Sequence, residues 1–229
     1  MQEQTILSMQ ERLQTLAQSL GADLVGFCKL PSSPIKSMPS LRYAVSIAVR
    51  LSKTVLKTIE DAPSFVYFQH YRTANALLDN IAFRLTGEIE RLGYAALPVA
   101  ASQSLGKNNP YQGVIAHKTV AALSGLGFVG KSGLFLSTEY GSGVRLATVL
   151  TDMPLQAQLP VIENGCGACT LCRDACPAGA IYGELPKTNG ERNFDEEKCS
   201  RYMKEHFQDI GRGSVCGICI KVCPKNKLQ

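Results

Sequence analysis

Residues Cys166–Pro177 read CGACTLCRDACP, and this stretch decides how the later part of the 229-residue chain folds. Two residues separate the neighbouring members of its first three cysteines, and three residues separate the third cysteine from the fourth. The short spacing lets a tight loop bring three thiols together, whereas the longer step followed by proline sends the fourth thiol elsewhere. A similar stretch, CGICIKVCP, follows at Cys216–Pro224, and Cys199 lies between the two.

This spacing is that of bacterial ferredoxins, in which three neighbouring thiolates hold one iron–sulfur cube and the fourth thiolate binds a second cube. The chain has nine cysteines, and all except Cys28 lie between residues 166 and 223. The remaining eight thiolates make two sets of four, which predicts two 4Fe–4S clusters that carry single electrons.

The second stretch lacks one cysteine of a full repeat. That cysteine would stand three residues before Cys216, where the sequence has Gly213. Cys199 is the other cysteine of the region and most economically supplies the missing ligand. Cluster 1 is therefore predicted at Cys166, Cys169, Cys172 and Cys223, and cluster 2 at Cys176, Cys199, Cys216 and Cys219.

Three other interpretations of the cysteines are open. An even number of cysteines suits disulfides, although residues 1–20 show no signal peptide and a cytoplasmic chain favours metal. Zinc also binds Cys-x2-Cys pairs, but the interlocked spacing with two Cys-Pro endings is that of cubes. A three-iron cluster at the second site would leave Cys199 without a role. The lone Cys28 lies in an apolar run and is expected to be a small buried hydrophobe.

Composition narrows the class of protein. Hydrophobic residues make up 45% of the chain, which is ordinary for a soluble globular protein, and no stretch is long enough to span a membrane. The formal net charge is +5 with cysteines counted as neutral. Two oxidised clusters, each with four thiolates, would add about −2 apiece and bring the net charge to about +1. The charge therefore gives no support for nucleic-acid binding.

Hydrophobic periodicity predicts an α+β domain over residues 1–157, then a ferredoxin-like domain over residues 158–229, with a link at 154–164. Helices are predicted at 2–20, 71–92 and 114–123, and strands at 24–30, 44–51, 94–99, 134–137 and 144–150. Because the two kinds of element do not alternate as regular βαβ units, an α+β fold is expected rather than a doubly wound sheet.

Residues Gly125–Ser132 read GLGFVGKS and match both the P-loop pattern and the dinucleotide-binding pattern. Either pattern binds phosphate only when a strand enters the loop and a helix leaves it. The predicted order here is a helix, then the glycines, then a strand, so nucleotide binding is not expected. The glycines suit a turn or a backbone surface close to another cofactor. The polar stretch Ser102–Gln112 is predicted to be a surface or active-site loop.

The chain resembles the epoxyqueuosine reductases and the related reductive dehalogenases in several stretches and in the order of its cysteines. The stretches are His117-Lys118, Ser124–Lys131, Gly141–Leu146 and Leu150–Asp152. The resemblance implies a nitroreductase-like domain that holds cobalamin, with flavin as the alternative, beside a ferredoxin-like domain whose two clusters supply its electrons. By the same resemblance, the cofactor is lined by Gly125, Gly127, Gly130, Lys131, Ser132, Gly141 and Arg145.

The chain also departs from this family. The position of the family's aspartate general acid falls on Tyr111, which is the predicted proton donor; a turn residue is the other interpretation. His117 and His70 are further candidates for a metal ligand or a proton donor. The helical repeats that help epoxyqueuosine reductases grip tRNA do not follow Cys223, so tRNA is not an expected partner.

The predicted function is a cytoplasmic, anaerobic iron–sulfur reductase. A low-potential donor such as ferredoxin or flavodoxin would pass electrons through the two clusters to cobalamin, which would reduce an unidentified small-molecule or corrinoid substrate. The alternative is a ferredoxin-like carrier that reduces or reactivates a partner such as a corrinoid protein. The polar loop and the glycines favour the enzyme, whereas the missing aspartate favours the carrier.

Overall fold

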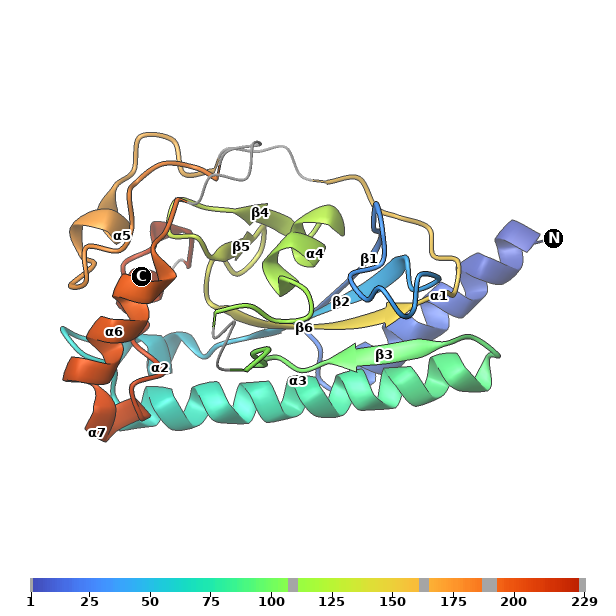
Figure 1. The fold of residues 1–229 in the computed structure, drawn as a ribbon, viewed down its shortest axis with the longest axis horizontal. Helices are drawn as coiled ribbons and strands as arrows, with labels where there is room; N and C mark the ends of the chain where they lie inside the picture. The colour runs from blue at the N-terminus through green and yellow to red at the C-terminus, as the bar shows by residue number, and fades with distance from the viewer. Residues whose placement is uncertain (1, 107–110, 161–164, 187–192, 227–229) are drawn as a thin grey trace. The chain divides into compact units, whose positions relative to one another are not determined.

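The computed structural model describes residues 2–106, 111–160, 165–186 and 193–226 (Figure 1). Parts of the predicted polar loop (107–110) and of the predicted link (161–164) lie outside the described residues. The chain forms two compact units, each assembled from three stretches, whereas the predicted division at residue 157 has two continuous segments. Unit 1 comprises Met1–Val49, Ala74–Gly127 and Arg145–Val161, and unit 2 comprises Arg50–Thr73, Phe128–Val144 and Ile162–Gln229.

Unit 1 is built around a four-stranded sheet with the strand order β1-β2-β6-β3. Its strands are β1 (Leu24–Lys29), β2 (Tyr43–Arg50), β3 (Ala96–Val99) and β6 (Val144–Thr151). β1 is antiparallel to β2, with Leu24 opposite Ala48, and β3 is antiparallel to β6, with Ala96 opposite Thr151. Nearly every residue of β1 and β2 is buried, so both faces of this part of the sheet are covered.

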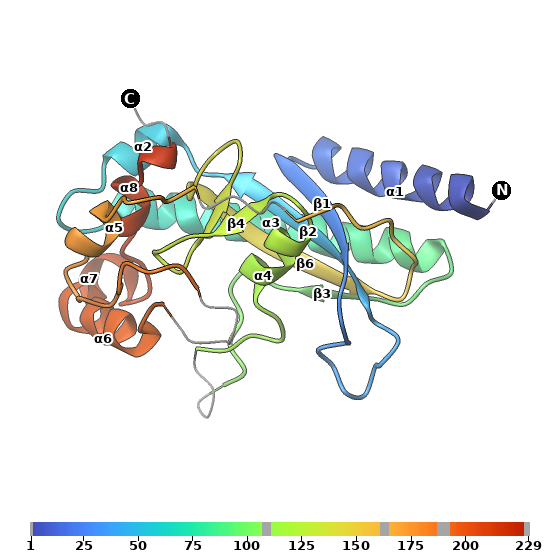
Figure 2. The same ribbon diagram turned by 90° about the horizontal axis from the view of Figure 1, so that it is seen from above.

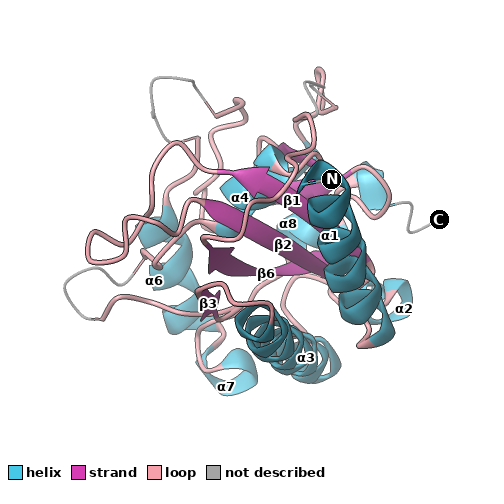
Figure 3. Cartoon of the chain, turned by 90° about the vertical axis from the view of Figure 1, so that its right-hand side faces the viewer, coloured by secondary structure: helices cyan, strands magenta, loops and turns pink. Residues whose placement is uncertain are grey.

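Helices cover both faces of the sheet. α1 (Gln2–Ser19) and the later part of α3 (Phe65–Arg91) lie on one face, and α4 (His117–Leu123) lies on the other (Figure 3). Both α1 and α4 contact β1. The core on the α4 side consists of apolar side chains from the strands, the intervening loop and the helix, namely Cys28, Leu30, Leu41, Ala44, Val99, Val120 and Leu150. Cys28 is 1% exposed, as expected for a small buried hydrophobe.

The structure confirms the α+β class, with an antiparallel sheet and helices outside regular βαβ units. The helix predicted from residue 71 begins earlier, at Phe65, because the Ser64 hydroxyl caps it by accepting a hydrogen bond from the Tyr67 amide at 3.0 Å. Phe65 and Val66 are 66% and 57% exposed, so the apolar stripe that guided the prediction does not extend to the true start.

Unit 2 contains short helices and a small sheet. Its elements are α2 (Lys53–Lys57), α5 (Leu171–Asp174), α6 (Glu196–His206), α7 (Gln208–Gly211), α8 (Ile218–Lys221) and a 3-10 turn at Pro224–Asn226. We call residues 165–226 the cysteine segment. In Figure 2 its helices α8 and α5 lie close to α2, whereas α7 and α6 lie farther from α2, and α8 contacts both α2 and α5. β4 (Gly127–Val129) pairs with β5 (Phe135–Ser137), and only Gly127 of this pair belongs to unit 1.

The glycine-rich stretch follows helix α4 and leads into β4 and β5. This is the predicted order and the reverse of a phosphate-binding loop. No helix in the described part of the chain is both long and apolar enough to cross a membrane.

Candidate metal centre

The two cysteine-rich stretches form the same local structure. Cys172 lies in α5 and Cys219 lies in α8, and the two helices contact each other. Cys176 and Cys223 follow these helices at equal spacing, and a proline comes after each of them. The repeat is therefore structural as well as sequential, as in a two-cluster ferredoxin.

The thiols of the cysteine segment gather in two groups. The Cys172 thiol is influenced by the charges of Cys166, Cys223 and Cys169. The Cys219 thiol is influenced by Cys216, Cys199 and Cys176, with a smaller effect from Cys172. The structure thus brings together Cys166, Cys169, Cys172 and Cys223 in one group, and Cys176, Cys199, Cys216 and Cys219 in the other.

The protein by itself disfavours the thiolate form of five of these cysteines. Burial is the largest cause and raises the pKa of Cys172, Cys216, Cys219 and Cys223. Burial together with Cys216, Cys176 and Asp195 raises the pKa of Cys199 to about 12. Crowded, desolvated thiolates repel one another, so a cationic partner is needed to hold them deprotonated.

All nine cysteines are free thiols. Among the described residues, no three His, Cys, Asp or Glu side chains converge on the position of one metal ion. Thiolates around a 4Fe–4S cube stand farther apart than the ligands of a single ion, because iron and sulfide occupy the space between them.

Helix α6 explains why the second stretch has glycine where a cysteine would complete the repeat. Gly213 has φ +63°, and a Cβ at this position would lie 2.7 Å from the Lys204 Cα in α6. A ligand side chain therefore has no room at residue 213. The same helix carries Cys199 and begins after Asp195, whose carboxylate accepts a hydrogen bond from the Lys198 amide at 2.9 Å. The helix that excludes one thiol supplies another.

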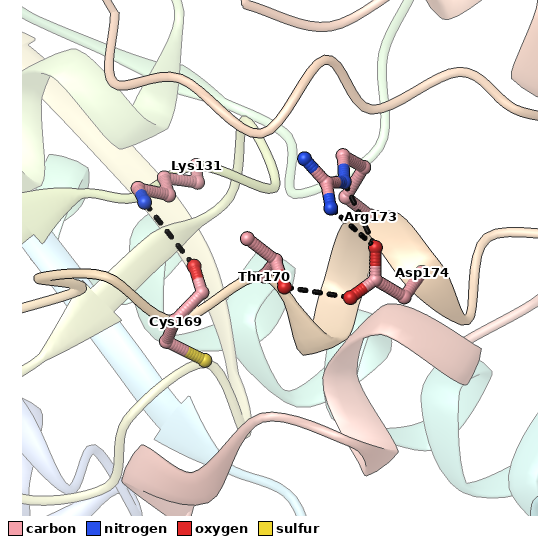
Figure 4. A network of polar contacts seen from close by, with 5 residues as sticks. All are labelled: Lys131, Cys169, Thr170, Arg173 and Asp174. Atoms are coloured by element: carbon pink, nitrogen blue, oxygen red, sulfur yellow. Dashed lines mark hydrogen bonds and ion pairs between the residues drawn. The ribbon is translucent and has the colours of Figure 1, made fainter.

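The later part of the glycine-rich stretch packs against the cysteine segment. A Cβ on Gly130 would lie 3.2 Å from the Cys166 sulfur. The Lys131 ammonium donates to the Cys169 carbonyl at 3.2 Å (Figure 4). The buried Asn193 side chain donates to the carbonyls of Gly130 and Lys131, at 3.0 and 3.3 Å. The close approach that glycine permits here is therefore to the protein's own cysteine segment.

A second turn, at residues 141–143, contacts the end of the cysteine segment. A Cβ on Gly141 would lie 2.6 Å from the Lys225 carbonyl carbon. The Asn226 side-chain oxygen accepts hydrogen bonds from the Ser142 hydroxyl at 3.1 Å and from the Gly143 amide at 3.0 Å. The Ser142 hydroxyl is also hydrogen-bonded to the Cys223 thiol. The turn at residues 141–143, predicted to line a corrin, thus holds the Cys223 loop in place.

Of the other predicted cofactor residues, Gly125 and Gly127 lie in unit 1, and Ser132 forms a hydrogen bond within its own turn. A Cβ on Gly125 would lie 2.7 Å from the Leu159 carbonyl oxygen. Gly127 has φ +156°, which is nearly extended, and begins β4. The Ser132 hydroxyl accepts a hydrogen bond from the Leu134 amide at 3.4 Å.

Arg145 belongs to a group of polar residues that we call the unit 1 polar cluster. Its members are Asn75, Asp79, the backbone of Ala100 and Ala101, His117, Arg145 and Thr148. The Arg145 guanidinium donates to the Asn75 side chain at 2.9 Å and to the Ala101 carbonyl at 3.2 Å. The Asp79 carboxylate accepts from the Ala101 amide at 2.8 Å.

His117 is bonded at both ring nitrogens inside this cluster. Its Nε2 lies 2.9 Å from the Ala100 carbonyl, which can only accept, so this nitrogen donates. Its Nδ1 then accepts from the Thr148 hydroxyl at 2.8 Å. Burial, partly offset by the Ala100 carbonyl and reinforced by Arg145, lowers the pKa of His117, so the neutral ring is favoured.

The two remaining sequence candidates lie elsewhere. Tyr111 is 43% exposed. His70 lines a cavity of about 560 Å³ in unit 2, together with residues from Arg50 to Leu56 and the turn at Glu139–Gly143. Its Nε2 accepts from the Ser52 amide at 2.9 Å, and burial lowers its pKa.

Sequence reasoning missed several residues that surround the thiols, namely Ser142, Asn193, Asp195 and Asn226. Single polar residues carry no periodic or spacing signal. Asp195 alone had a local clue, since an Asp one residue before a Glu-rich start of a helix is a typical cap.

Comparisons with known proteins identify the chain's relatives. The family described as "4Fe-4S double cluster binding domain" matches residues 165–226. The epoxyqueuosine reductase of Lactococcus garvieae is 39% identical over 118 residues, which cover 50% of this chain and 33% of that protein. The tetrachloroethene reductive dehalogenase of Dehalobacter restrictus is 26% identical over 195 residues, covering 80% of this chain and 33% of that protein.

A solved reductive dehalogenase, whose structure suggests a mechanism for B12-dependent dehalogenation, shares the fold. It aligns with a TM-score of 0.75 at 22% identity, over 93% of this chain and 31% of that one. The chain thus spans about a third of the length of the curated relatives described above. The resemblance seen in the sequence is confirmed: the chain is similar to epoxyqueuosine reductases and reductive dehalogenases, and its residues 165–226 match a 4Fe–4S double cluster binding domain.

Proposed function

We propose that this protein is an iron–sulfur oxidoreductase that holds two 4Fe–4S clusters on the eight thiols of its cysteine segment. Cys166, Cys169, Cys172 and Cys223 would hold cluster 1, and Cys176, Cys199, Cys216 and Cys219 would hold cluster 2. One observation carries the proposal: the thiols gather as two groups of four, and within each group neighbouring thiols help to raise the pKa of Cys172 and Cys223, or of Cys199, Cys216 and Cys219.

The surrounding residues fit such clusters. Small residues leave room beside the thiols, as at Gly130, where a Cβ would lie 3.2 Å from the Cys166 sulfur. Backbone amides of Arg173, Ile218 and Lys225 donate to the sulfurs of Cys172, Cys216 and Cys223. Amide–sulfur hydrogen bonds of this kind are general features of iron–sulfur sites.

We further propose that electrons from a low-potential donor, such as ferredoxin or flavodoxin, reach an organic cofactor in a nitroreductase-like part of the chain. Cobalamin is the first choice because the related dehalogenase structure suggests B12-dependent chemistry, and flavin is the alternative. When bound, cobalamin would supply a low-valent metal that reduces a small-molecule or corrinoid substrate. By family resemblance Arg145 would lie beside the cofactor, and His117 is a candidate metal ligand or proton donor. Both form hydrogen bonds within the unit 1 polar cluster.

A second function is favoured by a different observation. Four of the residues expected to line a corrin contact the chain's own atoms instead, namely Gly125, Gly130, Lys131 and Gly141. A protein without an organic cofactor would be a ferredoxin-like carrier that reduces or reactivates a partner, for example a corrinoid protein.

Two measurements on the whole chain, purified without oxygen, separate these functions. Iron and sulfide analysis should give about eight of each per chain for two 4Fe–4S clusters. Zinc in place of iron would contradict both functions. Equilibrium titration with cobalamin and with flavin mononucleotide then decides between enzyme and carrier. Saturable binding of one cofactor supports the enzyme, whereas binding of neither supports the carrier.

A further inference from the structure

A cavity of about 560 Å³ in unit 2 is not used by the proposed function. Its walls come from the end of β2 and the loop to α2, from α2 and α3, and from the turn at Glu139–Gly143, and Asn226 completes them. None of these residues is a proposed cluster ligand, and all of them belong to unit 2. The volume lies in the usual range for sites that hold a small molecule.

The charged side chains that line this cavity, among the described residues, are two cations and one anion. Arg50 and Lys53 are the cations, and Glu139 is the anion. Charged residues that are close to these in the chain but outside the lining are Lys57, Glu60, Asp61, Arg72 and Lys225. The lining therefore carries one more positive charge than negative charge, which favours an anionic ligand.

The Arg50 guanidinium is positioned by an aromatic ring of the lining. Its central carbon lies 5.9 Å from the centroid of the Tyr140 ring, which is a cation–π distance. Both residues line the cavity. A guanidinium presents a planar set of N–H donors, which matches the paired oxygens of a carboxylate or a phosphate.

His70 adds a neutral hydrogen-bond donor to the lining. Its Nε2 accepts from the Ser52 amide at 2.9 Å, so the proton of the neutral ring is on Nδ1. Burial lowers the pKa of His70, which favours this neutral ring. Within the described part of the chain, Nδ1 has no hydrogen-bond partner, so it can donate to an oxygen of a ligand.

The buried part of the lining offers apolar contact. Leu51 and Leu56 are 3% and 1% exposed. The Asn226 side chain is also buried, but it is engaged: its oxygen accepts two hydrogen bonds and its nitrogen donates to the Ile220 carbonyl at 2.5 Å. A ligand that suits this lining has an apolar body as well as a charged end.

We propose that this cavity binds a small molecule whose apolar body ends in a carboxylate or a phosphate group. Arg50, Lys53 and the Nδ1–H of His70 hold the charged end. Leu51 and Leu56 contact the apolar body. Glu139 repels the charged end and so weakens the binding.

The test is isothermal titration calorimetry of the whole chain, purified without oxygen, at constant ionic strength. The probes are hexanoate, hexyl phosphate and hexanamide, which has the shape of hexanoate without its charge. Saturable binding of one or both anions is expected, and the tighter of the two identifies the charged group. Hexanamide should bind at least about tenfold more weakly than the better anion. Hexanamide that binds as tightly as the better anion, or no saturable binding of either anion, would overturn the inference.

Three variants then test which residues hold the anion. Arg50→Gln and Lys53→Gln should each weaken binding of the better anion about tenfold, whereas Glu139→Gln should tighten it about threefold. All three side chains are exposed, so the fold should tolerate these changes. Lys57→Gln and Glu60→Gln are matched controls that should leave the affinity unchanged, because both residues are exposed and lie outside the lining. Anion binding that neither Arg50→Gln nor Lys53→Gln weakens would show that the anion binds elsewhere.

Discussion

The cysteine segment of unit 2 and the unit 1 polar cluster both collect partly or fully buried polar groups, but they satisfy them differently. In the unit 1 polar cluster, His117, Arg145 and Asp79 each find partners within the protein. In the cysteine segment, burial and neighbouring thiols raise the pKa of Cys172, Cys199 and Cys219, so the protein by itself disfavours their thiolate form. The first arrangement is complete as it stands, whereas the second needs iron from outside.

The largest effect is expected from removing the thiol of Cys199, which lies between the two cysteine-rich stretches. Cys199→Ser should lose cluster 2 and lower the iron content from about eight to about four per chain. Cys28→Ser is the matched control, since Cys28 lies in the apolar core of unit 1 and should leave the iron content unchanged. Iron and sulfide analysis with visible absorbance measures both. Full iron content in Cys199→Ser would show that another residue completes cluster 2.

A smaller effect is expected where helix α6 closes over Gly213. Gly213→Ala combines a positive φ with a Cβ 2.7 Å from backbone, so it should lower the free energy of unfolding by about 2–4 kcal/mol. Gly167→Ala also has a positive φ but no atom within 4 Å, so it should cost only about 1 kcal/mol. Anaerobic thermal unfolding compares the two. Equal losses of stability would mean that α6 does not exclude the side chain.

In the unit 1 polar cluster, Thr148→Val keeps the shape of the side chain and removes the hydroxyl that His117 Nδ1 accepts from. Leaving this buried nitrogen without a donor should lower the free energy of unfolding by about 1–2 kcal/mol, with the iron content unchanged. Thr73→Val is a suitable control, because Thr73 is exposed on α3 and bonds only within its helix among the contacts described. A loss of iron in Thr148→Val would contradict the separation of the two regions.

The smallest expected effect is a change in pH dependence. The pKa of His117 is lowered in the folded state, chiefly by burial, so the unfolded chain binds more protons at mildly acidic pH. Its contribution to stability is full above the unfolded pKa of about 6.5 and is lost as the pH falls towards the folded value. Between pH 7.5 and pH 5.5 the melting temperature of the wild type should therefore fall more than that of His117→Gln. Parallel curves would show that the ring is not held neutral.

Much of the fold could be predicted because long elements carry a periodic signal. The strands around Cys28 and Ala44 and the long helix through Leu78 and Ile89 were located from apolar residues alone. The short helices α2, α5, α7 and α8 span one turn or little more, which is too short for a period to appear. Helix α6 is longer but has no buried residue, so it lacks an apolar stripe to recognise.

For the candidate site, sequence predicted the thiols and missed their surroundings. The cysteine spacing is a local pattern, and in the structure it corresponds to the short helices α5 and α8, which contact each other. The contacts of Asn193 with Gly130, and of Asn226 with Ser142, join residues 63 and 84 positions apart. Pairings of that range depend on tertiary structure and leave no pattern in the chain.

Helix α3 gives its first turns to unit 2 and the rest to unit 1, and unit 2 takes residues from three places along the chain. During synthesis the N-terminal residues emerge first, so Tyr67, against which Gly217 packs, is made long before the cysteines that will sit beside it. The cysteine segment is therefore synthesised after the earlier stretches of unit 2, Arg50–Thr73 and Phe128–Val144. A fragment of residues 158–229 alone would lack the earlier stretches of unit 2. Its thiols would therefore be exposed to oxidation and to metals other than iron.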